Sequence, residues 1–217
     1  MDTQAIIMGG GFLLWGAVYL MGIRLGFKEK TFAIPWIAMC TNFSWEFLFA
    51  FVFNKSHPGL HPQAQFYSSL LLLAIDAVLI YLFVRYWRSD FPESVSEKWF
   101  LPYFLFGLLS CGGVVYYVTV EFQDWNGAYS AFGENVLTSA LFLTMFLRRN
   151  SLLGQSLYIA LAKMFGTILA SISTWMFMPE SKLLFFSYFL IFFLDALYTV
   201  LIYRKCKEEG VNPWKRF

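Results

Sequence analysis

The stretch Cys40-Thr41-Asn42-Phe43-Ser44-Trp45-Glu46-Phe47-Leu48-Phe49 places a carboxylic acid among aromatic and aliphatic residues inside a long apolar segment. The nearest cation along the chain is Lys55, beyond the end of the expected helix. Acidic side chains are costly at membrane depth and normally face the interior of a helix bundle. Glu46 is therefore either an acid that apolar surroundings keep protonated, ready for donation to a lipophilic substrate, or a side chain satisfied by a partner helix.

The composition indicates an integral membrane protein. Of the 217 residues, 59% are hydrophobic, 21% are aromatic and only 14% are charged, whereas roughly a quarter of the residues of a soluble domain are charged. The formal net charge of +2 comes from basic residues in short loops and the tail, so no nucleic-acid partner is expected. Three cysteines, Cys40, Cys111 and Cys206, make no disulfide framework.

Apolar segments of spanning length define the predicted fold class, an all-α polytopic membrane protein with seven transmembrane helices. A hydrocarbon core about 30 Å thick takes roughly 20 helical residues to cross. Lipid tolerates no unpaired strand edges, so the segments are predicted to be helices, in one domain covering residues 1–217. Their short connections predict that neighbours in sequence are antiparallel neighbours in space. The segments are Ile6–Ile23, Phe32–Phe53, Phe66–Tyr86, Trp99–Val120, Tyr129–Leu147, Leu152–Phe177 and Leu183–Tyr203.

The distribution of basic residues predicts the orientation, because loops rich in Lys and Arg stay cytoplasmic. The first, third and fifth loops and the tail carry most cations, and only Lys55 and Lys182 lie on the other side. The amino terminus is thus predicted outside the cytoplasm and the carboxyl terminus inside it. The first segment lacks a basic start and a small-residue cleavage site, so it is interpreted as a spanning helix, with Gly9-Gly10-Gly11 as a flexible start.

Two short matches suggest an internal repeat. Ser44-Trp45-Glu46-Phe47 resembles Thr174-Trp175-Met176-Phe177, and Ile75-Asp76-Ala77-Val78 resembles Leu194-Asp195-Ala196-Leu197. Both relate the first three segments to the last three, as in a parallel repeat of three plus one plus three helices. A small-solute transporter with this layout is the alternative to an enzyme. The proline or glycine hinges that such carriers use in equivalent positions are missing here.

Ionisable residues within or near the spans are candidates for a functional site. Asn42 shares a helix face with Glu46, and Tyr198 shares one with Asp195. Segment boundaries place Glu46 and Asp195 about 9 Å apart in depth, so a chamber between them could hold a hydrocarbon chain with one acid near each end. The full set is Glu46, Asp76, Glu121, Glu134, Lys163 and Asp195.

Three members of this set have structural interpretations. Lys163 and Asp76 both fall near mid-membrane and are predicted to form an ion pair that joins the sixth and third segments. Glu134 either lines the mouth of the chamber or caps the amino end of the fifth segment, where the helix dipole favours an anion.

Other kinds of chemistry have little support in the sequence. Pro58, Gly59 and Pro62 argue against a helical metal site at His57 and His61, so no metal is expected. There is no Asp-rich magnesium motif of the kind that ionises diphosphates. Any terpene chemistry should therefore start from protonation. A retinal-type receptor is a third alternative, but its lysine belongs in the seventh helix and Lys163 lies in the sixth.

The motif Cys40-Thr41-Asn42-Phe43-Ser44-Trp45-Glu46 resembles the Asn-x-x-Trp-Glu signature of small seven-helix terpene cyclases. These are the cyclases of fungal meroterpenoid and indole-diterpene pathways, the paspaline-cyclase type, and their bacterial relatives. Phe193-Leu194-Asp195-Ala196-Leu197-Tyr198 resembles the acid-bearing last helix of that family, and Asn212-Pro213-Trp214 resembles its ending. The likeness spans nearly the whole chain.

The resemblance implies a cyclase without cofactors that acts on a prenylated aromatic or polyketide. Protonation of a terminal epoxide or alkene would start a cation cascade, and the two acids of the family map onto Glu46 and Asp195. Asn42, Trp45, Glu134 and Tyr198 are expected to bind the substrate. The expected partners are this small molecule and the lipid of a bacterial inner membrane or endoplasmic reticulum.

Overall fold

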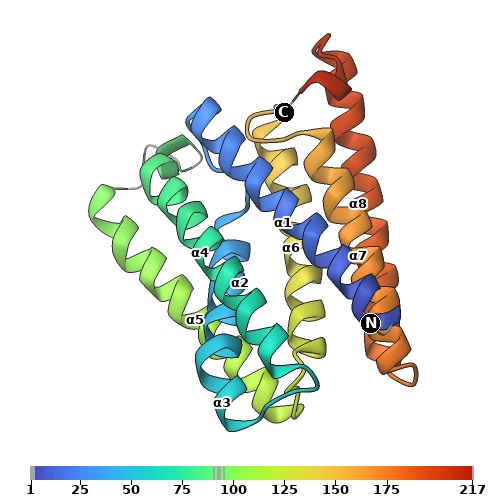
Figure 1. Cartoon of the computed structure of the whole chain (residues 1–217). Coiled ribbons are helices and arrows are strands. Elements are labelled where there is room, and N and C mark those ends of the chain that lie inside the picture. Colours follow the sequence, from blue (N-terminus) through green and yellow to red (C-terminus); the bar gives the residue numbers. More distant parts are fainter. Residues whose placement is uncertain (1–2, 90, 92–93, 95, 217) are drawn as a thin grey trace.

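The computed structural model describes residues 3–89, 91, 94 and 96–216. Seven helical spans within them are long and apolar enough to cross a membrane, which confirms the fold class expected from the sequence (Figure 1). The second span consists of three consecutive helical pieces, and short helices flank the others. The long helices are α1 (Thr3–Glu29), α2 (Trp36–Phe47), α4 (Pro62–Tyr86), α5 (Phe100–Glu121), α6 (Ala128–Arg149), α7 (Leu157–Phe177) and α8 (Lys182–Glu208), and the short ones are η1 (Leu48–Phe53), α3 (Asn54–Ser56), η2 (Trp87–Ser89), η3 (Glu97–Trp99) and η4 (Pro213–Lys215).

The second span changes its helical geometry directly after Glu46. α2 passes at Leu48 into the π-helical turn η1, which continues into α3. π turns are rare and are frequent at functional sites. The rings of Trp45 and Phe49 stack with centroids 4.2 Å apart, and Phe49 meets Phe53 edge-on at 5.2 Å. The wide turn therefore carries a continuous aromatic row from Trp45 towards the loop that follows.

Neighbours in sequence are not always neighbours in space. α1 packs along α7 and against α4, while α2, the next span, packs against α4, α5 and α6. Figure 1 shows α1 crossing diagonally in front of the other helices to reach α7. The prediction that consecutive spans pack together is therefore wrong for α1 and α2, and it is also wrong for α4 and α5 and for α6 and α7, which do not pack along each other. The connection between α1 and α2, around Phe32 to Pro35, is buried at the end of the bundle instead of forming a tight hairpin.

The packing pattern repeats between the two ends of the chain. α1 contacts α4 as α6 contacts α8, and α2 contacts α4 as α7 contacts α8. Across the two halves, α1 packs on α7 as α6 packs on α2. The first three spans thus correspond in order to the last three, with α5 between them. This is the correspondence that the two short sequence matches predict.

Gly10 and Gly11 near the start of α1 serve helix packing, and all three glycines lie within the helix, so the interpretation of Gly9-Gly10-Gly11 as a flexible start is wrong. A Cβ atom on Gly11 would lie 3.0 Å from the carbonyl oxygen of Gly166 in α7. A Cβ atom on Gly166 would in turn lie 3.1 Å from the side chain of Leu14. Small residues let membrane helices approach closely and gain van der Waals contact. Gly11 and Gly166 therefore set the distance between α1 and α7.

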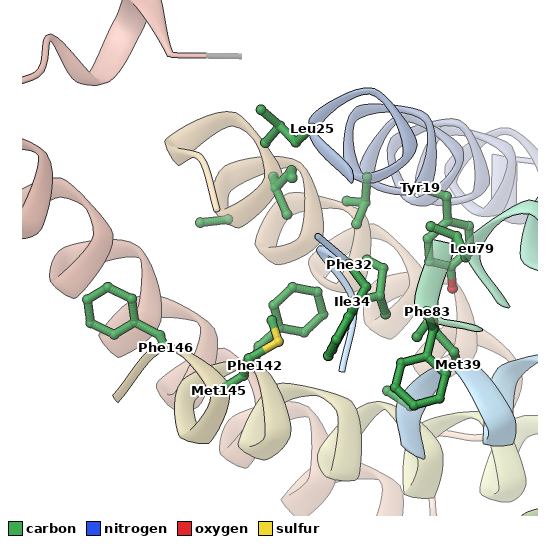
Figure 2. Close-up of a cluster of buried hydrophobic side chains, with 14 of the residues drawn as sticks. Tyr19, Leu25, Phe32, Ile34, Met39, Leu79, Phe83, Phe142, Met145 and Phe146 are labelled. Carbon is green, nitrogen blue, oxygen red and sulfur yellow. The ribbon is translucent and has the colours of Figure 1, made fainter. Parts of the chain in front are cut away.

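A cluster of buried apolar side chains fills the half of the bundle towards the Phe32–Pro35 connection (Figure 2). Phe32 and Phe83 meet edge to face with ring centroids 5.0 Å apart, and both rings are almost fully buried. Ile34, Met39 and Leu79 belong to the same cluster. This half of the bundle is solid, so any cavity must lie on the other side of these residues.

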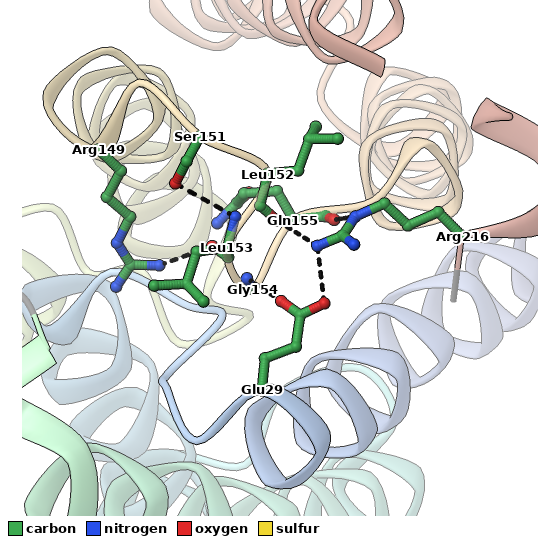
Figure 3. A network of polar contacts seen from close by, with 8 residues as sticks. All are labelled: Glu29, Arg149, Ser151, Leu152, Leu153, Gly154, Gln155 and Arg216. Atoms are coloured by element: carbon green, nitrogen blue, oxygen red, sulfur yellow. Dashed lines mark hydrogen bonds and ion pairs between the residues drawn. The ribbon is translucent and has the colours of Figure 1, made fainter. Parts of the chain in front are cut away.

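Polar contacts tie the chain together at that same end (Figure 3). The guanidinium of Arg216 lies 2.7 Å from Glu29 at the end of α1, and it also donates to the carbonyl oxygens of Leu152 and Gln155. Glu29 in turn accepts from the backbone N–H of Gly154 at 2.6 Å. The carboxyl-terminal segment thereby links α1 to the loop between α6 and α7.

The close approach of α1 and α7 yields a stability prediction. Gly11→Leu forces a branched side chain against the backbone of Gly166, and overpacking of this kind costs about 1–3 kcal/mol. Gly16→Leu is the matched control in the same helix, because nothing lies within 4 Å of a Cβ atom there. Thermal unfolding of the purified protein in detergent should show a lower midpoint for Gly11→Leu than for Gly16→Leu. Equal midpoints would contradict the proposed packing.

Candidate active site

A chamber of about 630 Å³ lies among α1, α2, α4, α6 and α7. Its floor includes Ile34, Met39 and Leu79, which also belong to the buried apolar cluster. At the opposite end it reaches the loop residues Leu60 and Gly127, where those helices begin or end. Cavities of roughly 300–1,000 Å³ lined mostly by apolar groups are typical binding sites for small molecules. The chamber is large enough for a prenylated ring system.

Three carboxyl groups from three different helices line this chamber: Glu46 of α2, Asp76 of α4 and Glu134 of α6. Glu46 is 4% exposed and Asp76 is 1% exposed, while Glu134 is half-buried. The three groups are close enough to interact electrostatically. Of the described residues that line the chamber, none is Lys or Arg. The lining is therefore apolar and acidic at once.

Asn42 and Glu46 lie one helical turn apart and face the chamber together, as the sequence predicts. The side-chain amide of Asn42 donates to Oδ2 of Asp76 at 2.6 Å, which joins α2 to α4. Ser69 of α4 lies within hydrogen-bonding reach of Glu46. Oε2 of Glu46 and Oδ1 of Asp76 are buried without a protein partner. Each acid thus keeps one oxygen for a bound molecule.

Trp45 is held in place by the loop before α6. Its indole N–H donates to the Ser130 hydroxyl at 3.0 Å, and that hydroxyl donates to Asp124 at 2.8 Å. Burial raises the pKa of Asp124, and hydrogen bonds from Ser130 counteract that increase. Gly127 has a φ of +71°, and a Cβ atom there would lie 2.5 Å from the Trp45 ring. The ring is therefore clamped between helix and loop at the chamber wall.

Glu134 lines the chamber, as one of the two interpretations of this residue expects. The other interpretation, a cap of the fifth span, is wrong. α6 begins at Ala128, and the carboxylate that accepts from its first turn belongs to Asp124, through the backbone N–H of Ser130 at 2.7 Å. Glu134 lies one to two turns further along α6, nearer the loop end of the chamber than the floor.

Asp195 does not line the chamber, so the prediction that it faces Glu46 across one pocket is wrong. Its Oδ1 atom accepts from Nζ of Lys163 at 2.5 Å, and both side chains are buried. Lys163 also donates to the Ser139 hydroxyl and lies 5.5 Å from the centroid of the Trp15 ring. Trp15 lines the chamber, so the ion pair lies behind it. The predicted ion pair of Lys163 with Asp76 is also wrong, because Lys163 pairs with Asp195.

Tyr198 is also away from the chamber. Its hydroxyl donates to the side chain of Gln155, and its ring packs edge-on against Phe142 with centroids 5.5 Å apart. Tyr198 and Asp195 lie on one face of α8, as helical spacing predicts, but this face packs on α6 and α7. Both residues hold α8 in the bundle, and neither is among the residues that line the chamber.

The chamber also contains Asp76, for which the sequence predicts an ion pair with Lys163, and Tyr19, which the sequence does not single out. Asp76 lies on the buried stripe of α4 together with Ser69, Leu72 and Leu79. That helical stripe is visible in the sequence and could have placed Asp76 in the interior. Tyr19 lies within hydrogen-bonding reach of Asn42. Tyr19 reaches the chamber because α1 packs across α4 and α7, and the sequence gives no signal for that packing.

The arrangement defines a seven-helix membrane protein with an acid-lined, lipophilic binding chamber. A family model of Pyr4-like transmembrane terpene cyclases matches residues 1–208, so the chain belongs to this family and is a membrane-bound terpene cyclase. The family membership supports the enzyme over the transporter alternative. Among the described residues, no group of three or more His, Cys, Asp or Glu side chains is placed to hold a metal ion.

Similar curated proteins come from fungi. The Pyr4-family terpene cyclase mfmH of Annulohypoxylon moriforme is 25% identical over 78% of this chain and 70% of its own length. The terpene cyclase macJ of Penicillium terrestre is 26% identical over 73% of this chain and 61% of its own, and andB of Emericella variicolor is 24% identical over 77% and 70%. No solved structure matches the chain.

The buried ion pair yields a second prediction. Asp195→Asn leaves the Lys163 ammonium buried without its counter-charge, which costs about 3–5 kcal/mol. The double variant Lys163→Met, Asp195→Leu removes both charges and should regain most of the lost thermal stability. Midpoints of unfolding in detergent measure both effects. If the double variant is both stable and active, Asp195 has a structural role. If the double variant is stable but inactive, Asp195 takes part in the reaction.

Proposed function

We propose that this cyclase protonates the prenyl chain of an aromatic or polyketide substrate at a terminal epoxide or alkene, with Glu46 as the proton donor. The observation that carries the proposal is the position of Glu46, which is 4% exposed in an apolar chamber with Oε2 unpartnered. Removal of a carboxyl group from water disfavours its charged form, so the neutral acid is the form that meets the substrate.

The chamber supports the cyclisation by shape. A flexible polyene loses much conformational freedom when it folds for ring closure. A fitted cavity imposes this loss at the binding step, so the barrier to ring closure itself is lower. The aromatic rings of Trp15, Tyr19 and Trp45 line the chamber and present faces that attract a cation. Exclusion of water keeps the carbocation from being captured before the rings have formed.

Asn42, Trp45 and Glu134 are proposed to shape the site around the reacting chain. Asn42 faces the chamber between Glu46 and Asp76, and Trp45 forms a rigid wall because Ser130 and Gly127 hold its ring. Glu134, nearer the loop end, is placed to accept a hydrogen bond from a hydroxyl of the aromatic part. Asp195 is proposed to be a positioning residue that acts through Lys163 on the chamber wall at Trp15.

The test is conversion of defined substrates by membranes that carry the protein. A farnesylated phenol, a geranylgeranylated phenol and their terminal epoxides are incubated with parent and variant membranes, and cyclised isomers are identified by mass spectrometry and NMR. Glu46→Gln removes the acidic proton at nearly constant volume and should lower conversion at least about 100-fold. Glu121→Gln is the matched control, because Glu121 is exposed at the end of α5. Conversion at the parent rate by Glu46→Gln would overturn the proposal.

A further inference from the structure

A cation cascade needs a base at its end as well as an acid at its start, and the chamber offers a second aspartate for that step. Asp76 lines the chamber, is 1% exposed and keeps Oδ1 unpartnered. Its other oxygen accepts from the Asn42 amide at 2.6 Å, which fixes the rotamer of the carboxyl group. Glu46 lies one helical turn from Asn42 on α2. The same face of α2 therefore carries the proton donor Glu46 and the amide that holds Asp76.

The internal repeat gives independent support for a special role of Asp76. α4 and α8 are equivalent spans, and so are α2 and α7. Asp76 of α4 is held by a residue of α2, and Asp195 of α8 is held by a residue of α7. The partner of Asp195 is a lysine that neutralises it, whereas the partner of Asp76 is a neutral amide. Each of these two equivalent acids has one buried oxygen without a protein partner, Oδ1 of Asp76 and Oδ2 of Asp195, but only Asp76 lines the chamber.

We propose that Asp76, oriented by Asn42, accepts the proton that the substrate loses at the end of the cascade. This proposal rests on the proposed function. The Glu46 O–H bond breaks, and its proton adds either to the terminal alkene carbon or to the epoxide oxygen, whose C–O bond to the more substituted carbon breaks and leaves a hydroxyl group. The π electrons of the chain then form the ring bonds. A C–H bond beside the last cationic carbon breaks, its electron pair forms a C=C bond, and the proton goes to Oδ1 of Asp76.

The proton balance closes within the chamber. The cycle starts with Glu46 neutral and Asp76 ionised, because Asp76 is the chamber acid whose oxygen accepts the Asn42 amide N–H. After one turnover Glu46 is a carboxylate and Asp76 a carboxylic acid, so transfer of one proton from Asp76 to Glu46 restores the starting state. No external oxidant, reductant or metal is required. The other titratable groups that line the chamber are Glu134, Tyr19 and His61. Glu134 is half-buried near the loop end, and His61 directly precedes α4 at that end, so neither lies as deep as Asp76.

The test uses a stable mimic of the carbocation. N,N-Dimethylfarnesylamine, protonated at neutral pH, and the neutral alcohol farnesol are titrated against the full-length protein in nanodiscs by calorimetry. The parent should prefer the ammonium probe. Asp76→Asn should reduce this preference at least about tenfold, because it removes a buried counter-charge. The matched control Glu134→Gln should reduce it less, and Asn42→Ala should lie between the two. Unchanged farnesol binding shows that the chamber is intact.

Two results would count against Asp76. The first is an ammonium preference that survives Asp76→Asn, and the second is a loss of preference in Glu134→Gln as large as in Asp76→Asn. With any prenylated phenol that the parent converts, Asp76→Asn should also yield alcohols from capture of the cation by water. Failure of the proposed function has a different signature, since it appears as conversion that does not depend on Glu46 while the ammonium preference still depends on Asp76.

Discussion

The cost of holding carboxyl groups away from water is the constraint on which this structure depends. Glu46, Asp76 and Glu134 face an apolar chamber in which no described lining residue is Lys or Arg. A buried ionised group without a counter-charge is strongly disfavoured, so such groups stay neutral or find donors. Asn42 supplies a donor to Asp76, and Ser69 lies beside Glu46. In the proposed mechanism the chamber thus holds Glu46 as a neutral acid and Asp76 as a carboxylate stabilised by the Asn42 donor, which suits a reaction that begins with protonation and ends with deprotonation.

The rest of the bundle holds the walls of this chamber in place. Gly11 and Gly166 let α1 lie close against α7, which closes one side of the chamber. The buried ion pair of Lys163 and Asp195 ties α7 to α8 directly behind Trp15. At the solid end, Arg216 draws the carboxyl-terminal segment onto Glu29 and the loop after α6. Together these contacts hold the walls on which the reacting groups are mounted.

The sequence predicted the spans and the acid-bearing second helix correctly because both depend on local properties. Apolar length marks each helix, and helical spacing alone puts Asn42 on the face of Glu46. The ion-pair partner of Lys163 could not be predicted from such local properties. Asp76 and Asp195 lie at comparable depths in equivalent spans, and the choice between them depends on which helices pack together. α1 reaches α7 instead of α2, and this long-range contact places Asp195 behind Trp15 and leaves Asp76 open to the chamber.

The central claim is that Glu46 is a protonated acid inside the chamber, and infrared spectroscopy tests it most directly. Spectra of the parent protein and of Glu46→Gln are recorded in nanodiscs at neutral pH, with Glu121→Gln as the exposed control. The account predicts a carboxylic-acid C=O stretching band that disappears in Glu46→Gln and remains in Glu121→Gln. If Glu46→Gln leaves every carboxylic-acid band of the parent in place, Glu46 is not protonated in the chamber and cannot be the proton donor.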